Sequence, residues 1–309
     1  MKLSIVTTLY HSQDYIEEFY QQITKQAKTI TSNYELIFVN DGSPDNSSEI
    51  AIKLHNQDKK VIVINLSKNF GHHKAIMTGL SHAKGDFIFL IDVDLDESPK
   101  NLKTFWNEIQ KDLSLDVVLA TKCDKKGSFL RKLGRNFFYN SFNYLSGTKI
   151  SPNHLVSRLM KKTYVEALLR HKERNIFLAA LCIDIGFNQK AIETPDHSYG
   201  FYSTYTFKKK ISMAIDAITS YSSKPLFSIF ILGTLISFLS FLFIIYILFR
   251  NIFFNAPLLG WSSMIISIYF IGGVIILSLG IIGIYLSKIY MEVKARPYNL
   301  IKSIYKKEK

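Results

Sequence analysis

The sequence contains only two cysteines, Cys123 and Cys182, and they lie far apart. Neither belongs to a C-x-x-C pair or stands at a metal-ligand spacing from a histidine, so neither a disulfide framework nor a structural zinc site is indicated. Internal repeats, low-complexity linkers and an export signal are also missing. The first apolar run, from Met1 to Tyr10, is too short for a signal-peptide core, and we interpret it as a β-strand. These absences fit a domain that folds in the reducing cytosol.

Charged residues are missing from two long stretches near the C-terminal end. No residue from Pro225 to Phe249, and none from Ala256 to Ser287, carries a charge. A helix needs ~20 apolar residues to cross the hydrocarbon core of a bilayer, and both stretches exceed that length. A buried core helix is the alternative for one such stretch, but two in tandem favour a pair of transmembrane helices.

Basic residues flank the two uncharged stretches and account for much of the formal net charge of +13. Lys208–Lys210 and Lys224 precede the first stretch, residues 288–309 are rich in lysine and arginine, and the loop between the stretches has only Arg250. The positive-inside rule therefore predicts a multi-pass protein with both termini in the cytoplasm. Nucleic acid is the other usual partner of a basic chain, but the position of the charge favours anionic lipid headgroups. We expect a lipid bilayer as partner and no nucleic acid.

Before these stretches, short apolar runs rich in β-branched residues alternate with helix-length segments. The runs are Leu3–Thr8, Tyr34–Asn40, Val61–Leu66, Phe87–Ile91 and Val117–Thr121. This alternation predicts an α/β domain with a doubly wound, mostly parallel sheet. Such sheets bind ligands at the carboxyl ends of their strands, so polar residues just after the runs are candidate site residues. After about residue 122 the strand pattern is lost, and the sequence becomes basic and aromatic.

The strongest local signal is a run of acidic residues directly after Phe87–Ile91. Asp92, Asp94 and Asp96 follow at alternating positions. Three carboxylates this close repel one another unless a cation joins them, and hard divalent ions such as Mg²⁺ or Mn²⁺ prefer oxygen ligands. We therefore predict a metal site at Asp92 and Asp94 that binds a diphosphate. For Asp96, the alternative of capping the helix that opens near Pro99 stays open.

Weaker signals follow the other strands. Thr8 and Tyr10 end the first run, Asp41 opens an Asp-Gly-Ser turn after the second, and Asn69 and Lys74 follow the third, near the start of a helix. A carboxylate, backbone amides and a cation at one edge of a sheet would suit a nucleotide and its phosphates. Ordinary turn chemistry explains Asp41 equally well, and a solvated surface position is the usual alternative for a lone lysine.

Five motifs along the domain are Ser4–Tyr10, Phe38–Ser43, Asn69–His72, Gly79–Asp86 and Asp92–Asp96. In order and spacing they resemble the family-2 glycosyltransferases with a GT-A fold. The two uncharged stretches and Gly283–Pro297 further resemble the bacterial polyprenyl-phosphate glycosyltransferases related to dolichol-phosphate mannose synthase. The resemblance covers essentially the whole chain. It implies a cytoplasmic GT-A domain followed by juxtamembrane helices and two transmembrane helices.

The resemblance also implies a reaction and its site residues. A sugar would pass, with inversion, from a nucleoside diphosphate sugar, with a UDP-sugar as the expected donor, to a polyprenyl phosphate at the cytoplasmic face of the plasma membrane, for cell-surface glycan synthesis. Asp92 and Asp94 would hold Mg²⁺ or Mn²⁺, with Asp94 as the catalytic carboxylate, and Asp96 stands where relatives often carry a metal-binding glutamine. The expected donor-binding residues are Thr8, Tyr10, Asp41, Asn69, Lys74 and Asp92, and those facing the lipid phosphate are Arg131, Arg135 and Arg158.

Two positions depart from the family pattern. Asn40 replaces the first of two aspartates that usually precede Gly-Ser, and Val156 replaces an acceptor-side aspartate. A phosphate acceptor is already an anionic nucleophile and tolerates this loss, whereas a sugar hydroxyl needs a positioned base. Asp184 and His154 are the candidates for such a base. Asp184 lies in an apolar run whose burial would raise the pKa of its carboxyl, and a buried structural role is its alternative.

Two alternatives to transfer onto polyprenyl phosphate therefore stay open, namely transfer to a sugar hydroxyl of a lipid-linked glycan and a catalytically inactive membrane scaffold. The expected organisation is a nucleotide-sugar-binding core at 1–122, an acceptor-side part at 123–198, a juxtamembrane amphipathic segment at 199–224, two transmembrane helices at 225–287 and a basic cytoplasmic tail at 288–309. Gly233 and Ser237 have a spacing suited to close helix contact, which is compatible with a homo-oligomer.

Overall fold

The computed structural model describes residues 1–122, 143–144, 154–173, 176, 178–194, 218–219, 222–254, 260–297 and 299–307. The chain divides into two compact units. One consists of residues 1–140, 148–204 and 296–309, and the other of residues 141–147 and 205–295. The segment that follows the last apolar helix thus belongs to the same unit as the N-terminal α/β domain.

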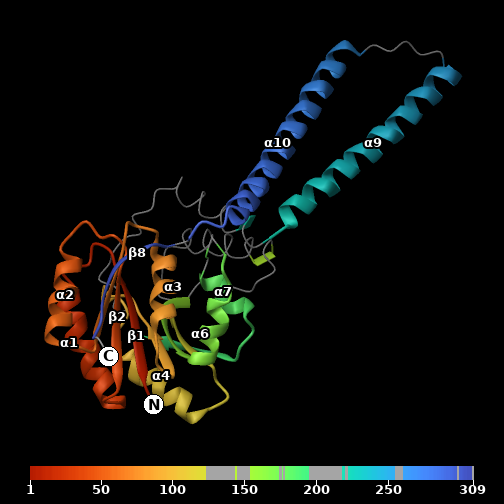
Figure 1. Ribbon diagram of the computed structural model, residues 1–309. Coiled ribbons are helices and arrows are strands. Elements are labelled where there is room, and N and C mark those ends of the chain that lie inside the picture. Colours follow the sequence, from red (N-terminus) through yellow and green to blue (C-terminus); the bar gives the residue numbers. More distant parts are fainter. Residues whose placement is uncertain are drawn as a thin grey trace. The chain divides into compact units, whose positions relative to one another are not determined.

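The first unit is built on an eight-stranded mixed sheet (Figure 1). Its strands are β1 (Leu3–Leu9), β2 (Tyr34–Asn40), β3 (Val61–Leu66), β4 (Phe87–Leu90), β5 (Val117–Lys122), β6 (His154–Lys161), β7 (Gln189–Thr194) and β8 (Ile301–Tyr305). In the order β7-β5-β6-β4-β1-β2-β3-β8, the strands β4, β1, β2 and β3 run parallel, whereas β6 and β8 are antiparallel to their neighbours. The predicted α/β class is confirmed, and each of the five predicted strands is present.

Helices cover both faces of the sheet, so its central strands are buried at nearly every position. α1 (Ile16–Ile30), α2 (Ser47–Gln57) and α4 (Asn101–Lys111) pack on one face, and α3 (His72–His82), α6 (Lys162–Leu169) and α7 (Leu178–Asp184) pack on the other. In α1, Phe19 and Ile23 are fully buried at helical spacing, while Glu17 stays exposed. This amphipathic pattern is what holds α1 against the sheet.

Helix α3 packs tightly on β1 and β2 through a glycine. A Cβ atom added to Gly79 would stand 2.4 Å from Cγ1 of Val6 and 2.9 Å from Cγ2 of Val39, so a larger residue would force the helix away from the sheet. Close packing brings the first turn of α3 to the carboxyl ends of β1 and β2. The polar residues at those strand ends and at the start of α3 therefore share one edge of the sheet.

The second unit contains two long apolar helices, α9 (Lys224–Phe254) and α10 (Trp261–Val293). Lys224–Phe243 and Ser267–Val293 are long and apolar enough to cross a membrane, and the described part of the chain does not bury them. Large apolar side chains such as Phe230, which is 64% exposed, line them. Lipid is the solvent that such surfaces suit. The helices confirm the two predicted apolar spans, and α10 continues beyond the predicted end of the second one.

Three strands lie where the sequence pattern indicates none, so the prediction that strands end near residue 122 is wrong. β6 is central in the sheet, but it is antiparallel, and Ser157 and Arg158 interrupt its apolar run. β7 and β8 are edge strands with mostly exposed or half-buried residues, and Lys190 and Lys302 lie within them. Charged edge strands carry a weak hydrophobic pattern. The predicted basic tail therefore includes a strand of the sheet.

Candidate active site

Two loops at the carboxyl edge of the sheet interlock around Asp41. Its side chain is almost fully buried, and its two oxygens accept the backbone N–H groups of Phe70 at 2.7 Å and Gly71 at 2.9 Å. The next residue, Gly42, has a φ of 64°, and a Cβ atom there would stand 2.4 Å from the carbonyl carbon of Lys68. Only glycine fits this approach. The loop after β2 is thus fastened to the loop that leads into α3.

This arrangement differs from the role expected for Asp41. Its carboxylate faces backbone amides, so the structure shows a residue that braces two loops, and direct contact with a nucleoside stays a prediction. Burial raises the pKa of Asp41, although the two amide hydrogen bonds and the charge of Lys74 act in the opposite direction. Lys74, in the first turn of α3, is therefore close enough to influence Asp41, in agreement with its predicted place at this edge.

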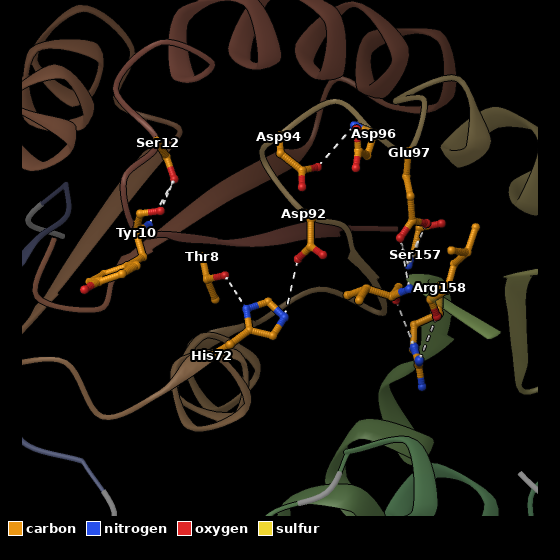
Figure 2. Close-up of polar contacts among 12 residues, drawn as sticks. Thr8, Tyr10, Ser12, His72, Asp92, Asp94, Asp96, Glu97, Ser157 and Arg158 are labelled. Atoms are coloured by element: carbon orange, nitrogen blue, oxygen red, sulfur yellow. Dashed lines mark hydrogen bonds and ion pairs between the residues drawn. The ribbon is translucent and has the colours of Figure 1, made fainter. Parts of the chain in front are cut away.

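The acidic residues occupy the loop after β4 (Figure 2). Oδ1 of Asp92 lies 3.6 Å from Nε2 of His72, and Nδ1 of the same ring lies 3.1 Å from the hydroxyl of Thr8. Oδ1 of Asp94 accepts the backbone N–H of Asp96 at 3.1 Å. Three elements that are distant in sequence, β1, α3 and the loop after β4, thus contribute linked polar side chains to one edge of the sheet.

Leu95 holds this loop in an uncommon backbone conformation. Its φ of 63° lies in the left-handed region, which costs energy for a residue with a branched side chain. The same side chain packs, partly buried, against the core on the α1 side of the sheet. Packing of Leu95 therefore offsets the backbone cost and fixes the turn between Asp94 and Asp96.

The electrostatics of the loop leave it short of positive charge. Burial raises the pKa of Asp92 well above its ordinary value, and the carboxylates of Asp94 and Glu97 push it in the same direction. Partial burial also raises the pKa of Asp94. Partial burial and the neighbouring His73 lower the pKa of His72 to about 4, so its ring is neutral at pH 7. A bound cation would favour the ionised form of these carboxylates.

Comparison with known proteins decides the family. A family model described as "Glycosyl transferase family 2" matches residues 4–169, just over half of the chain. The chain belongs to glycosyl transferase family 2. It is 43% identical to a Mycobacterium tuberculosis (strain CDC 1551 / Oshkosh) protein with a glycosyltransferase name, over 99% of this chain and 89% of that protein. It is 34% identical to the uncharacterized glycosyltransferase YkcC of Bacillus subtilis (strain 168), over 99% and 94% of the two chains. It is 32% identical to the bactoprenol glucosyl transferase of Shigella phage SfX, over 98% and 99%.

Membership of family 2 confirms the predicted glycosyltransferase class and the GT-A fold. In this family-2 glycosyltransferase the family match runs from β1 to the end of α6, so it includes the loops that carry Asp41, His72 and the acidic residues. The similarity to the three relatives extends much further, over almost all of the chain, and therefore includes α9 and α10.

The donor groups of the site suit a hard divalent ion that is completed by substrate. Within the described ranges, no group of three or more His, Cys, Asp or Glu side chains is gathered as a metal site, so Asp92, Asp94 and Asp96 are not assembled as three protein ligands. Mg²⁺ bound together with a substrate phosphate commonly uses only one or two carboxylates. Asp92 and Asp94, with mutually repelling charges, fit that smaller role. Asp96 as a third ligand stays a prediction.

Glu97 ties the acidic loop to β6, a role that its place in the acidic run does not reveal. Its carboxylate is buried, and it accepts the backbone N–H groups of Val156 at 2.9 Å and Ser157 at 3.0 Å. Figure 2 shows this side chain turned away from Asp92 and towards Ser157. The backbone at Val156, where the family pattern has an aspartate, is therefore bonded to a carboxylate from the neighbouring loop.

Arg158 lies inside the domain rather than at a lipid surface. Its side chain donates to the carbonyl oxygens of Leu155 and Val156 and to the thiol of Cys182, at 3.2, 3.1 and 2.8 Å. The residue is only 6% exposed, so the expected contact with a lipid phosphate is not available in this conformation. The positive charge of Arg158 instead lowers the pKa of Asp92, against the larger effect of burial. The structure thus shows an internal counter-charge to the acidic loop.

Replacing Glu97 by glutamine is expected to destabilise the protein by about 1–3 kcal/mol. A glutamine offers one acceptor oxygen where two backbone N–H groups now bind a carboxylate, and its NH₂ group would face one of those donors. Thermal unfolding of the purified protein would measure the loss. Glu166→Gln is the matched control, because that side chain is 58% exposed and its ion pair, with Lys162 at 3.7 Å, lies at the surface. Equal unfolding temperatures for the two variants would contradict the assigned role of Glu97.

The remaining donor-side and lipid-side candidates are accessible or not described. Tyr10 is 48% exposed, and Asn69 is also exposed, so both can meet a ligand at this edge. Arg131 and Arg135 lie outside the described residues, as does most of the expected juxtamembrane segment at 199–224. Their predicted contacts with lipid therefore stay predictions.

The two candidate bases have different surroundings. Asp184 is the last residue of α7 and is exposed, so the prediction that it is buried is wrong. The apolar run before it is a helix, whose residues Leu181 and Cys182 are buried, and Asp184 lies at its exposed C-terminal end. His154 begins β6, and burial and the charge of Arg158 lower its pKa. A neutral imidazole can accept a proton, so His154 remains a candidate base.

Proposed function

We propose that this family-2 glycosyltransferase moves a sugar from a nucleoside diphosphate sugar, specifically a UDP-sugar, to a polyprenyl phosphate. The observation that carries the proposal is the extent of the similarity to the phage bactoprenol glucosyl transferase, which is 32% identical over 98% of this chain. That similarity includes the two apolar helices as well as the GT-A domain. A lipid acceptor accounts for α9 and α10, because two membrane helices would hold the site among the headgroups where a polyprenyl phosphate lies.

The chemistry of the acceptor supports a phosphate nucleophile. A phosphate monoester, with a second pKa near ~6, is largely dianionic at neutral pH and needs no base, whereas a sugar hydroxyl does. Val156 stands at the acceptor side without a carboxylate, and Asp184 is exposed. A phosphate oxygen would attack the anomeric carbon as the bond to the nucleoside diphosphate breaks on the opposite face. The product is a glycosyl phosphate of inverted configuration.

Asp92, Asp94, His72 and the loops around Asp41 each have a role in the proposed reaction. When bound, Mg²⁺ or Mn²⁺ supplies positive charge that stabilises the departing nucleoside diphosphate. Asp92 and Asp94 would hold the ion, His72 would orient Asp92, and the interlocked loops around Asp41 would shape the position of the nucleoside. Removal of divalent ions by a chelator should therefore weaken UDP binding as well as transfer.

Both chain ends belong on the cytoplasmic side of the plasma membrane. The pairing of β8, which follows α10, with β3 of the domain that precedes α9 supports this topology, because it requires the segments before and after the helix pair to share one side of the bilayer. An even number of crossings meets this condition. The basic residues that flank the spans favour the cytoplasmic side for this domain.

Transfer of a labelled sugar from a UDP-sugar to undecaprenyl phosphate is the expected result for the purified full-length protein. Undecaprenol is the matched control acceptor, since it has the same chain without the phosphate, and it should receive no sugar. An extracted lipid-linked glycan tests the second candidate function, transfer to a sugar hydroxyl, for which His154 at the start of β6 would serve as the base. Incorporation into that glycan alone would contradict the proposal. Absence of UDP binding with Mn²⁺ in calorimetry would favour the inactive scaffold.

A further inference from the structure

The last strand of the sheet is joined to the donor side of the site by hydrogen bonds. β8 pairs antiparallel with β3, with Ser303 opposite Asn65 and a bulge in the register just beyond that pair. Nδ2 of Asn65 donates to Oγ of Ser303 at 3.1 Å. Just before β8, three residues ahead of Ser303, the carbonyl oxygen of Leu300 accepts the N–H of Ser67 at 2.8 Å. The segment after α10 therefore contacts β3 at the point where the loop to α3 begins.

The bond at Ser303 continues to the turn after β2. Oδ1 of Asn65 accepts Nδ2 of Asn40 at 3.1 Å and the hydroxyl of Ser48 at 3.1 Å. Oδ1 of Asn40 accepts the backbone N–H of Ser43 at 2.9 Å. Asn40 is 5% exposed and Asn65 is 8% exposed, so water does not readily replace these partners. These hydrogen bonds form one continuous polar chain, Ser303–Asn65–Asn40–Ser43, from β8 to the Asp-Gly-Ser turn.

The backbone N–H of Ser43 fixes the direction of the hydrogen bonds in this polar chain. The backbone N–H of Ser43 can only donate, so the group of Asn40 that faces it is the oxygen, and the Asn40 amide nitrogen points at Asn65. Asn65 must then receive that bond with its oxygen and offer its own nitrogen to Ser303. Ser303 is the acceptor that ends the chain. An aspartate at position 40, as in the family pattern, would have no N–H group to donate to Asn65. The asparagine found there makes this hydrogen bond possible.

We propose that Ser303 is a positioning residue for the donor site, acting through Asn65 and Asn40 on the turn that contains Asp41. This inference rests on the proposed function, because it assumes that the turn helps to bind a nucleoside diphosphate. The turn is interlocked with the loop before α3, so a loosened turn disturbs both loops that meet at Asp41. The strand that follows the membrane helices is therefore a component of the donor site.

The test compares variants of Ser303 with and without a side-chain hydroxyl. Ser303→Val removes the acceptor, Ser303→Thr keeps it on a side chain of the same shape, and Ser303→Ala removes it with a smaller group. Lys302→Ala is the neighbouring control, because Lys302 is exposed. Each full-length variant is examined by hydrogen exchange over residues 40–46, by UDP binding in the presence of Mn²⁺, and by transfer kinetics.

Ser303→Val and Ser303→Ala are expected to speed amide exchange over residues 40–46 and to weaken UDP binding by about five- to tenfold, the effect of a buried donor left without a partner. KM for the donor should rise by the same factor, while kcat stays unchanged. Ser303→Thr and Lys302→Ala should behave like the unaltered protein. Wild-type exchange and affinity in both Ser303→Val and Ser303→Ala would overturn the inference. Faster exchange in those variants, together with no UDP binding by the unaltered protein, would support the polar chain and refute the proposed function.

Discussion

Replacing Asp94 by asparagine is expected to lower sugar transfer by about a thousandfold or more while the fold stays intact. Asparagine has the shape of aspartate, and its side-chain oxygen can still accept the N–H of Asp96 that now binds Oδ1 of Asp94. What disappears is one of the two negative charges that would hold the divalent ion. Because the remaining carboxylate of Asp92 loses a repelling neighbour, the unfolding temperature should not fall.

A matched control separates loss of the ion from loss of any surface carboxylate. Asp112→Asn makes the same isosteric change in an exposed residue after α4, where the side chain accepts bonds from the N–H and hydroxyl of Ser114. This variant should transfer sugar at the normal rate. Calorimetry should show Mn²⁺-dependent UDP binding in Asp112→Asn and a much weaker dependence on Mn²⁺ in Asp94→Asn. Normal turnover in Asp94→Asn would refute the assignment of the metal site.

The part of the fold that can be predicted from sequence is the part that is buried on both faces. β1 and β2 are buried along their whole length because helices cover them on each side, so most of their residues are apolar and each appears as a short hydrophobic run. β8 has exposed or half-buried residues throughout and includes Lys302, so nothing in its composition distinguishes it from a basic tail. Its identity as a strand depends on its pairing with β3, a partner more than two hundred residues away.

The same distinction applies to the site. Asp92 and Asp94 could be predicted because a strand places them together within one short segment of sequence. The contacts of Glu97, Asn40 and Arg158 include partners in other elements, namely the backbone of β6, the side chain of Asn65 and the thiol of Cys182, and no local pattern records such contacts. Asp184 was misjudged for a related reason, since the apolar run is a short helix that ends at Asp184, and only this last residue of the helix is exposed.

Gly42→Ala is expected to remove about 2–4 kcal/mol of stability and to weaken donor binding by about tenfold or more. A Cβ atom at this position would stand 2.4 Å from the carbonyl carbon of Lys68 and 2.5 Å from the backbone nitrogen of Asn69. Both are backbone atoms, so no side chain can turn aside to make room. The loop before α3 must shift instead, and it carries the two N–H groups that hold Asp41. Thermal unfolding and UDP titration would measure the two effects.

Gly186→Ala is the control for Gly42→Ala. It measures the cost of a side chain in the left-handed backbone conformation where no atom collides with the added Cβ. Gly186 has a φ of 76°, also in the left-handed region, but a Cβ atom there would meet nothing closer than 3.9 Å. Alanine at this position should cost only the conformational part, about 1 kcal/mol, and should leave UDP affinity unchanged. If Gly42→Ala behaved in the same way, the two loops would not be interlocked as the structure shows. A larger loss in Gly42→Ala, accompanied by weaker UDP binding, would mean that close contact between the loops is itself a requirement of the donor site.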